Sequence, residues 1–488
     1  MKHILRILLI SIAFPVIGFA QTPKKIAPKK TQPMDLKVRI KGLTSGTCLL
    51  ANHYGDKQFI QDSAKVDMNG WMEFKDTVAR DGGIYLIVLP NKKYFEIVLT
   101  DEQKFTVETD TADFVRNMKI TGNKENQYFY EYLNYLADQQ KKLEPIRKTL
   151  SETKNKDTIA LMNKKSFAID SVVKQYKRDY YRKVHPETFM AEVLAAMDEP
   201  ESIPYDKCPK KANGTIDSTY NYWNFRNHYW DGMNFNDDRL IRTPVYANKM
   251  KFYLEKLVNQ NPDSIMAGCD WLIEKTRPSK ELFKYTVYYC TYTYETSKVM
   301  GYDAIFVHIV DKYYKTNQAY WLNDEQKTKI INRADQLTYS LIGKTAVNLT
   351  MFDTSGHVRS LMEIKAKYTV VIFWDPTCSH CKKEVPLLKT YYDSLQKAGI
   401  PFEVFAIVSE MDLPAWKAYV KENKLPWINV AAKDSKELAN AKYYYDVYST
   451  PTIFLLNEKK VIIGKRLDVD GLKGFLDHTI DIDKKKPK

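Results

Sequence analysis

The sequence predicts three folded parts in succession: a small antiparallel β domain, a mainly α domain and an α/β domain at the C-terminus. Three observations support this order. Apolar and polar residues alternate after residue 35, apolar residues recur at helical spacing between residues 113 and 340, and strand-like and helix-like runs alternate after residue 341. A chain of 488 residues with 44% hydrophobic residues is long and apolar enough for several packed cores.

Residues 1–20 have the pattern of a secretory signal peptide. Lys2 and Arg6 precede an apolar stretch, and the small-x-small triplet that ends it predicts cleavage after Ala20. The alternative is a membrane anchor, but the apolar stretch is shorter than the roughly 20 residues that a span requires. We therefore expect an exported protein of the periplasm or cell envelope, with residues 21–34 as a linker rich in lysine and proline.

The formal net charge of +14 is concentrated near the two ends of the chain. Two positive charges lie in the first 20 residues, four in residues 21–34 and four in the last five residues, which leaves a net charge of +4 for the rest. Nucleic-acid binding requires a basic face on a folded domain. This charge distribution therefore argues against a nucleic-acid partner.

Residues 35–112 are predicted to form the antiparallel β domain. Leu36, Val38 and Ile40 alternate with basic residues, as in a half-buried strand. Further strand-like runs follow, separated by turn signals such as Asn69-Gly70, up to about residue 110.

Residues 113–340 are predicted to be mainly helical. One helical face carries Phe129, Tyr132, Leu133 and Leu136 at spacings of three and four residues. A second helix is expected after the sequence His-Pro-Glu at 185–187, with Phe189, Val193, Leu194 and Met197 directed inward.

A tyrosine-rich stretch at residues 284–295 places Tyr285, Tyr288, Tyr289 and Tyr292 on one helical face. We interpret these tyrosines as packing residues, with a peptide-contacting surface as the alternative, since rigid aromatic side chains suit both roles.

Four cysteines are scattered without paired spacing: Cys48, Cys208, Cys269 and Cys290. We expect buried free thiols, with a bridge between Cys269 and Cys290 as the alternative.

Residues 341–488 are predicted to form the α/β domain, which ends in a basic tail. The run YTVVIFW at 368–374 has the β-branched composition of a central, fully buried strand. Cys378 and Cys381 follow at CxxC spacing, directly before a predicted helix that extends to about residue 397. Strand-like and helix-like runs then alternate to the end of the domain.

These motifs resemble those of the thioredoxin-like superfamily, in particular exported thiol–disulfide oxidoreductases of the TlpA/ResA type. The resemblance rests on GKTAVNLTMFDTSG, on VVIFW before the cysteines, on the sequence CKKExP that begins at Cys381, and on Ser-Thr-Pro-Thr at 449–452. It covers less than a third of the chain. The β and helical parts resemble poorly characterised modules that often precede such domains in Gram-negative bacteria.

The resemblance implies an enzyme in which Cys378 attacks a disulfide and Cys381 resolves the mixed disulfide, so that the two cysteines form a redox-active disulfide. A CxxC site at the start of a helix lowers the pKa of its first thiol. A drop of about two pKa units requires about 2.7 kcal/mol, whereas the helix dipole typically supplies only about 0.3–1 kcal/mol. Hydrogen bonds from Cys381 and neighbouring amide groups must supply the rest, with Ser379 and His380 tuning the redox potential.

Two further positions are carried over from the family. Thr450-Pro451 matches the cis-proline loop that faces the cysteines and pairs with substrate. Glu384 matches an acid beside the active site that handles protons for the second cysteine, with a surface ion pair to Lys382 or Lys383 as the alternative. The family's buried aspartate and the tryptophan before the first cysteine are replaced here by Ile372 and Thr377, which makes Glu384 the best acid/base available to Cys381.

The expected partners are protein thiols or disulfides in the cell envelope, together with an electron donor or acceptor such as a membrane thiol–disulfide protein. Neither a cofactor nor a metal is expected. The direction of exchange depends on the electron partner, so reductase, oxidase and isomerase activities stay open.

Three alternatives compete with this interpretation. A structural zinc site needs four ligands, and a single CxxC supplies only two. A peroxiredoxin-like peroxidase would have a threonine three residues before its cysteine, whereas Thr377 directly precedes Cys378. A non-catalytic envelope binding protein that uses the domain as a scaffold would have no reason to keep Cys378, Cys381 and Pro451 together.

Overall fold

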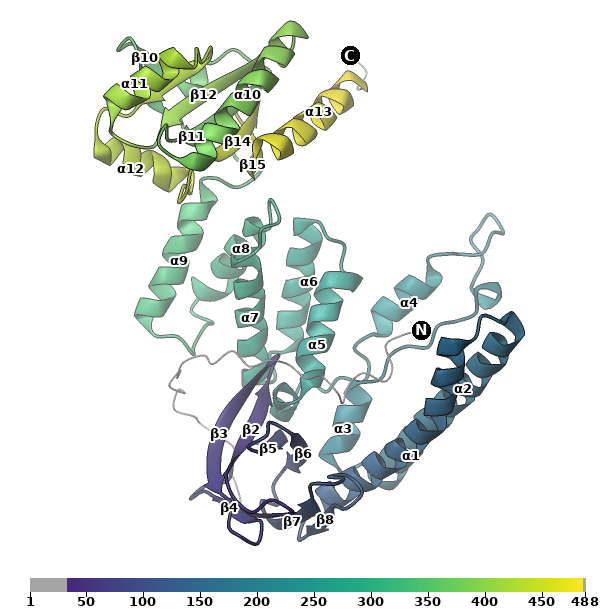
Figure 1. Cartoon of the computed structure of the whole chain (residues 1–488). Helices are drawn as coiled ribbons and strands as arrows, with labels where there is room; N and C mark the ends of the chain where they lie inside the picture. Colours follow the sequence, from purple (N-terminus) through teal and green to yellow (C-terminus); the bar gives the residue numbers. More distant parts are fainter. Residues whose placement is uncertain (1–32, 486–488) are drawn as a thin grey trace.

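The computed structural model describes residues 33–485, except for the side chain of Arg182. The predicted signal peptide, nearly all of the predicted linker and the last three residues of the basic tail lie outside this range. Strands come first along the chain, helices follow, and a mixed unit ends it (Figure 1). The predicted order of structural classes is therefore confirmed, whereas the exact domain boundaries stay a prediction.

The N-terminal part is a pair of four-stranded sheets, ordered β4-β1-β7-β8 and β3-β2-β5-β6. The strands are β1 (Asp35–Lys41), β2 (Thr47–Tyr54), β3 (Lys57–Lys65), β4 (Trp71–Lys75), β5 (Gly83–Val88), β6 (Tyr94–Leu99), β7 (Lys104–Asp110) and β8 (Lys119–Thr121). Neighbouring strands are antiparallel, except that β1 runs parallel to β7. Leu36, Val38 and Ile40 are fully buried between the two sheets, as their alternation predicted.

Two of these strands were not predicted from the sequence. Residues 50–53 of β2 are buried in succession, because one face of the strand meets the other sheet and the opposite face meets the helical part. Such a strand shows no alternation. The three-residue strand β8 pairs with β7 beyond the expected end of the domain at residue 112.

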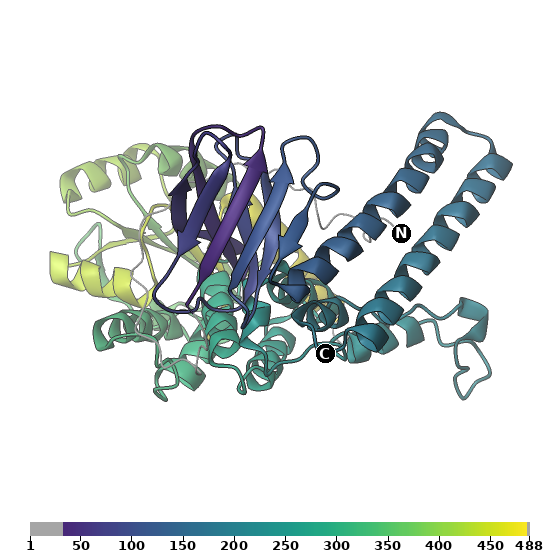
Figure 2. The same cartoon turned by 90° about the horizontal axis from the view of Figure 1, so that it is seen from below.

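The middle part is helical. Its α-helices are α1 (Lys124–Glu152), α2 (Lys156–Lys177), α3 (Phe189–Ala196), α4 (Tyr220–His228), α5 (Pro244–Phe252), α6 (Pro262–Lys275), α7 (Lys280–Glu295), α8 (Asp303–Ile309) and α9 (Asp324–Thr338). Helices α1 and α2 form a long hairpin that projects from the body of the protein (Figures 1 and 2). The inward faces predicted for α1 and α3 are confirmed by the burial of Phe129, Leu133, Phe189 and Leu194.

The outer face of the sheet β3-β2-β5-β6 packs against these helices. Tyr285 on α7 lies at this contact, and its hydroxyl donates to the Asp56 carboxylate and accepts from the Asp56 amide, both at 3.0 Å. Gly55 has a φ of +64°, and a Cβ atom at this position would lie 2.1 Å from the Tyr285 ring. The Gly55 amide donates to the carbonyl of Ile241 at 2.8 Å. The strand-rich and helical parts are therefore closely packed at this point.

The packing interpretation of the tyrosine-rich stretch holds for Tyr285, which is 4% exposed. Tyr288 and Tyr292 differ, since they are 45% and 56% exposed and stack on each other at the surface.

The four scattered cysteines are all buried and unbridged, as expected.

The C-terminal part is a seven-stranded sheet ordered β10-β9-β13-β12-β11-β14-β15. Its strands are β9 (Thr350–Asp353), β10 (Val358–Ser360), β11 (Tyr368–Trp374), β12 (Phe402–Val408), β13 (Ile428–Ala431), β14 (Thr452–Asn457) and β15 (Ile462–Leu467). Its helices are α10 (Ser379–Lys397), α11 (Leu413–Glu422), α12 (Ser435–Tyr444) and α13 (Val469–Lys485). All seven residues of β11 are buried, because α10, α11 and α13 pack on one face of the sheet and α12 on the other.

None of the helices within residues 33–485 combines the length and the apolar character that crossing a bilayer requires.

Candidate active site

Cys378 lies in the connection between the central strand and the following helix. β11 ends at Trp374, and Cys378 is the N-cap residue of α10. The Asp375 carboxylate accepts hydrogen bonds from the backbone and the hydroxyl of Thr377, both at 2.7 Å, and the Cys378 amide donates to the Asp375 carbonyl at 3.2 Å. These bonds form a tight turn, in which the first cysteine stands before the unpaired N–H groups of the helix start.

The surroundings of Cys378 favour its ionised form. Its side chain is partly exposed. The backbone N–H of Cys381 is the principal cause that lowers the pKa of the Cys378 thiol, assisted by the Thr450 side chain, the Cys381 thiol and the backbone of His380. Hydrogen bonds to a charged group favour the charge. The start of the helix and these neighbouring groups therefore both favour the thiolate of Cys378.

Cys381 has the opposite environment. It is 1% exposed and lies in the core between the sheet and α10. Burial raises the pKa of the Cys381 thiol to about 11, although the Asp375 amide donates a hydrogen bond to its Sγ at 3.4 Å. The pair is therefore asymmetric: an accessible, readily ionised sulfur in front of a buried, protonated one.

The Thr450-Pro451 loop lies against the first cysteine. The peptide bond between these two residues is cis, as predicted. When Cys378 is protonated, its S–H donates to the Thr450 carbonyl oxygen at 3.4 Å. Strand β14 begins directly after the loop, at Thr452, and pairs with β11, which leads to Cys378. The sheet thus brings together two motifs that lie 72 residues apart in the sequence.

The other predicted site residues lie on the first turns of α10. Ser379 and His380 are exposed beside Cys378. Glu384 is partly buried, and its Oε2 accepts a hydrogen bond from the Val469 amide at 2.8 Å, at the start of α13. This contact differs from both roles considered for Glu384, and its acid/base role stays a prediction.

Two contributors to the site were not predicted from the sequence. Asp375 shapes the turn with its carboxylate and hydrogen-bonds Cys381 with its amide. The Tyr419 ring on α11 packs at a tilt of 57° against the Trp374 ring, with centroids 5.3 Å apart. Burial raises the pKa of Tyr419, and the charge that Cys381 carries when it ionises raises this pKa further. The position of Asp375 in the sequence, between a buried strand and a CxxC motif, could have indicated its role. Nothing local marked Tyr419, which reaches the site through the tertiary fold.

Among the residues that the structure describes, no group of three or more His, Cys, Asp or Glu side chains is arranged to hold a metal ion.

Family models match three separate segments of the chain. Residues 366–462 match a family described as thioredoxin-like. Residues 34–129 and 190–340 match two domains of unknown function, DUF4369 and DUF5106. The thioredoxin-like segment contains the cysteine pair and the cis-proline loop.

Curated relatives resemble the same C-terminal region. The chain is 30% identical over 122 residues to the thiol-disulfide oxidoreductase ResA of Bacillus thuringiensis subsp. konkukian, an alignment that covers 25% of this chain and 67% of the relative. It is 28% identical over 138 residues to a ResA of Bacillus cereus, covering 28% of this chain and 76% of the relative.

Two solved structures are also similar. A thioredoxin-like protein from Bacteroides caccae aligns over 57% of this chain and 99% of its own, with 21% identity and a TM-score of 0.44. A domain of a possible thiol-disulfide isomerase from Cytophaga hutchinsonii aligns over 30% of this chain and 97% of its own, with 37% identity and a TM-score of 0.27. From the family match, the curated relatives and the site, we conclude that this chain belongs, through its C-terminal domain, to the ResA/TlpA-type thiol–disulfide oxidoreductases of the thioredoxin-like superfamily.

Proposed function

We propose that this protein exchanges disulfides with protein substrates through Cys378 and Cys381. The observation that carries the proposal is the asymmetry of the pair. Cys378 is accessible and has a lowered pKa, whereas Cys381 is buried with a pKa raised to about 11. An attacking thiol needs access and thiolate character, and a resolving thiol needs only to be near the bond that it will break.

In the reducing direction, the Cys378 thiolate attacks one sulfur of a substrate disulfide. The substrate's S–S bond breaks, its other sulfur leaves as a thiolate that takes a proton from water, and a mixed disulfide forms. Cys381 then loses its proton and attacks Sγ of Cys378, which releases the second substrate thiol. Two electrons have passed to the substrate, and the enzyme carries a Cys378–Cys381 disulfide. The oxidising direction is the reverse sequence.

The neighbouring residues have supporting roles in this proposal. The loop at Thr450-Pro451 offers its backbone to an extended substrate beside the attacking sulfur, which is consistent with the 3.4 Å contact between Cys378 and the Thr450 carbonyl. Glu384 accepts the proton that Cys381 must lose. Ser379 and His380 set the redox potential from their exposed positions beside Cys378.

We further propose export to the periplasm or cell envelope, on the basis of the predicted signal peptide. The substrates would then be envelope proteins with thiols or disulfides. A separate thiol–disulfide protein, such as one in the membrane, would exchange electrons with Cys378 and Cys381.

A redox titration tests the proposal. The protein is equilibrated with mixtures of reduced and oxidised glutathione, and the fraction with a Cys378–Cys381 disulfide is measured by thiol labelling. We expect a reversible two-electron transition at a potential less negative than thioredoxin's roughly −270 mV, because a stabilised Cys378 thiolate favours the reduced form. A potential at or below that value would refute the tuning by Ser379 and His380. Failure of the two cysteines to form a disulfide would refute the proposed function itself.

A further inference from the structure

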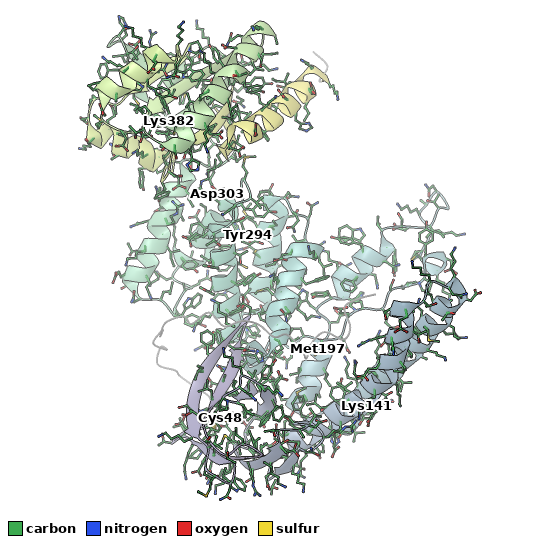
Figure 3. The ribbon with its side chains drawn as sticks, viewed as in Figure 1. Cys48, Lys141, Met197, Tyr294, Asp303 and Lys382 are labelled. Atoms are coloured by element: carbon green, nitrogen blue, oxygen red, sulfur yellow. The ribbon has the colours of Figure 1, made fainter. Side chains whose placement is uncertain are left out.

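Two clusters of polar contacts join the helical part to the C-terminal domain. The first is centred on Lys465 of β15, which is 3% exposed. Its Nζ donates to Asp303, the first residue of α8, at 2.5 Å and to Ser340 at 3.2 Å. Figure 3 shows Asp303 on the helical part and Lys382, the residue after the second cysteine, on the lower half of the C-terminal domain, toward that part.

The second contact is centred on Asp446, whose side chain is fully buried. Arg333 of α9 approaches it with two nitrogen atoms: Nη1 bonds Oδ1, and Nη2 bonds Oδ2 at 3.1 Å. Arg466 of β15 binds Oδ2 as well. Burial alone would raise the pKa of Asp446, but hydrogen bonds from Arg333 and the charges of both arginines hold it below its ordinary value. Asp446 is therefore an ionised, fully paired carboxylate at the domain junction.

Asp446 begins the short segment that leads to the substrate loop. Arg333 also donates to the Tyr448 hydroxyl at 3.0 Å, and its guanidinium lies over the Tyr448 ring, 5.3 Å from the centroid. The Tyr448 hydroxyl in turn donates to Gln336, one turn along α9, at 3.0 Å. Two residues after Tyr448 comes Thr450, whose carbonyl faces the Cys378 sulfur. Arg333 thus holds this segment at two points within four residues of Thr450.

We propose that Arg333 is a positioning residue for the exchange reaction: the helical part uses it to fix residues 446–451, so that the Thr450 backbone stands where an extended substrate can pair with it beside Cys378. The inference rests on the proposed function, and it gives the helical part a role in substrate recognition. A bidentate arginine–carboxylate pair is suited to this task, because it fixes orientation as well as distance.

The matched control is the other junction. Asp303 and Lys465 join the same two parts of the protein, but they do not touch residues 446–451 in any hydrogen bond or ion pair that the structure shows between described residues. If Arg333 matters only because it holds the domains together, Asp303→Asn should have the same effect as Arg333→Gln. If Arg333 positions the loop, the two variants should differ.

The test uses the full-length protein in its reduced form and measures how fast it reduces two different disulfide substrates. Insulin presents a peptide backbone on both sides of each of its disulfides, whereas 5,5′-dithiobis(2-nitrobenzoate) presents none. For Arg333→Gln we expect kcat/KM toward insulin to fall about tenfold, mainly through KM, as for the loss of one or two backbone hydrogen bonds to substrate. The rate with the small disulfide should stay within about twofold of the wild-type rate, because Arg333→Gln leaves the attack by Cys378 itself unchanged. Arg333→Lys should recover part of the loss, and it serves as the second variant if Arg333→Gln does not fold.

The inference is overturned if Arg333→Gln reacts with insulin as fast as the wild type, if both disulfides slow equally, or if Asp303→Asn gives the same loss of kcat/KM. Its failure is distinct from failure of the proposed function. If only the inference about Arg333 fails, the wild-type protein still exchanges disulfides and only the variants behave differently from expectation. If the proposed function fails, the wild-type protein itself reacts with neither disulfide.

Discussion

Replacing Cys381 by alanine is expected to trap the enzyme as a mixed disulfide with its substrate. Cys378 keeps its partial exposure, its place at the helix start and its contact with the Thr450 carbonyl, so it still attacks. The second step is lost, because the buried thiol that would break the mixed disulfide is absent. Non-reducing electrophoresis of the variant purified from its native cells should show adducts that disappear on reduction, and mass spectrometry of these adducts identifies the substrate.

Cys378→Ala is the matched control for this experiment. The remaining thiol of the CxxC pair, Cys381, is 1% exposed and has a pKa raised to about 11. It should therefore form essentially no adducts and support no exchange above background. Adducts of Cys378→Ala as abundant as those of Cys381→Ala would reverse the assignment of attacking and resolving thiols. Full exchange activity in either variant would exclude a CxxC mechanism.

Gly55→Ala is expected to destabilise the protein by about 3 kcal/mol. The left-handed φ of +64° costs a residue with a Cβ atom about 1–2 kcal/mol. The new methyl group would also lie 2.1 Å from the buried Tyr285 ring, and overpacking of this kind costs about 1–3 kcal/mol. Tyr285 cannot move freely, since its hydroxyl is bonded to Asp56. Urea unfolding followed by far-UV circular dichroism measures the loss.

Gly399→Ala is the control, because Gly399 has a nearly equal φ of +66° and no atom within 4 Å of the added Cβ. It should cost only the backbone strain, about 1–2 kcal/mol. If Gly55→Ala destabilised the protein no more than Gly399→Ala, the close packing of the strand-rich part on α7 would be wrong. That packing joins the strand-rich part to the helical part, which includes Arg333.

The C-terminal fold was predictable because its signals are local and strong. The run at residues 368–374 is apolar except for Thr369, and it forms the central strand with helices on both faces. Cys378, Cys381 and Pro451 could likewise be chosen from motifs, because spacing and neighbouring residues mark them in the sequence. The structure brings the three together, with the peptide bond before Pro451 in the cis form.

Other elements escaped prediction for physical reasons. Strand β2 is covered on both faces, so its sequence lacks alternation. Helix α2 has no fully buried residue, and the apolar residues on its inward face are only half-buried: Ile159, Met162, Ile169, Val173 and Tyr176. The parallel pairing of β1 with β7 joins segments about 70 residues apart, and register over that distance leaves no local mark.

The functional details that depend on tertiary contacts could not be predicted either. The Glu384 carboxylate caps α13 through Val469, a residue 85 positions along the chain. Arg333 reaches Asp446 across 113 positions. Neither residue type is unusual on a helix, so each contact becomes visible only once the domains are folded and joined.

The pH dependence of Cys378 alkylation shows whether the protein stabilises the Cys378 thiolate. The reduced Cys381→Ala protein is treated with iodoacetamide across a pH series, and modification of residue 378 is followed by mass spectrometry. Only the thiolate reacts, so the rate rises with pH through the pKa. We expect a midpoint clearly below the value of about 8.5 for a free peptide cysteine, because the surroundings of Cys378 lower its pKa. A midpoint at or above that value would contradict this expectation.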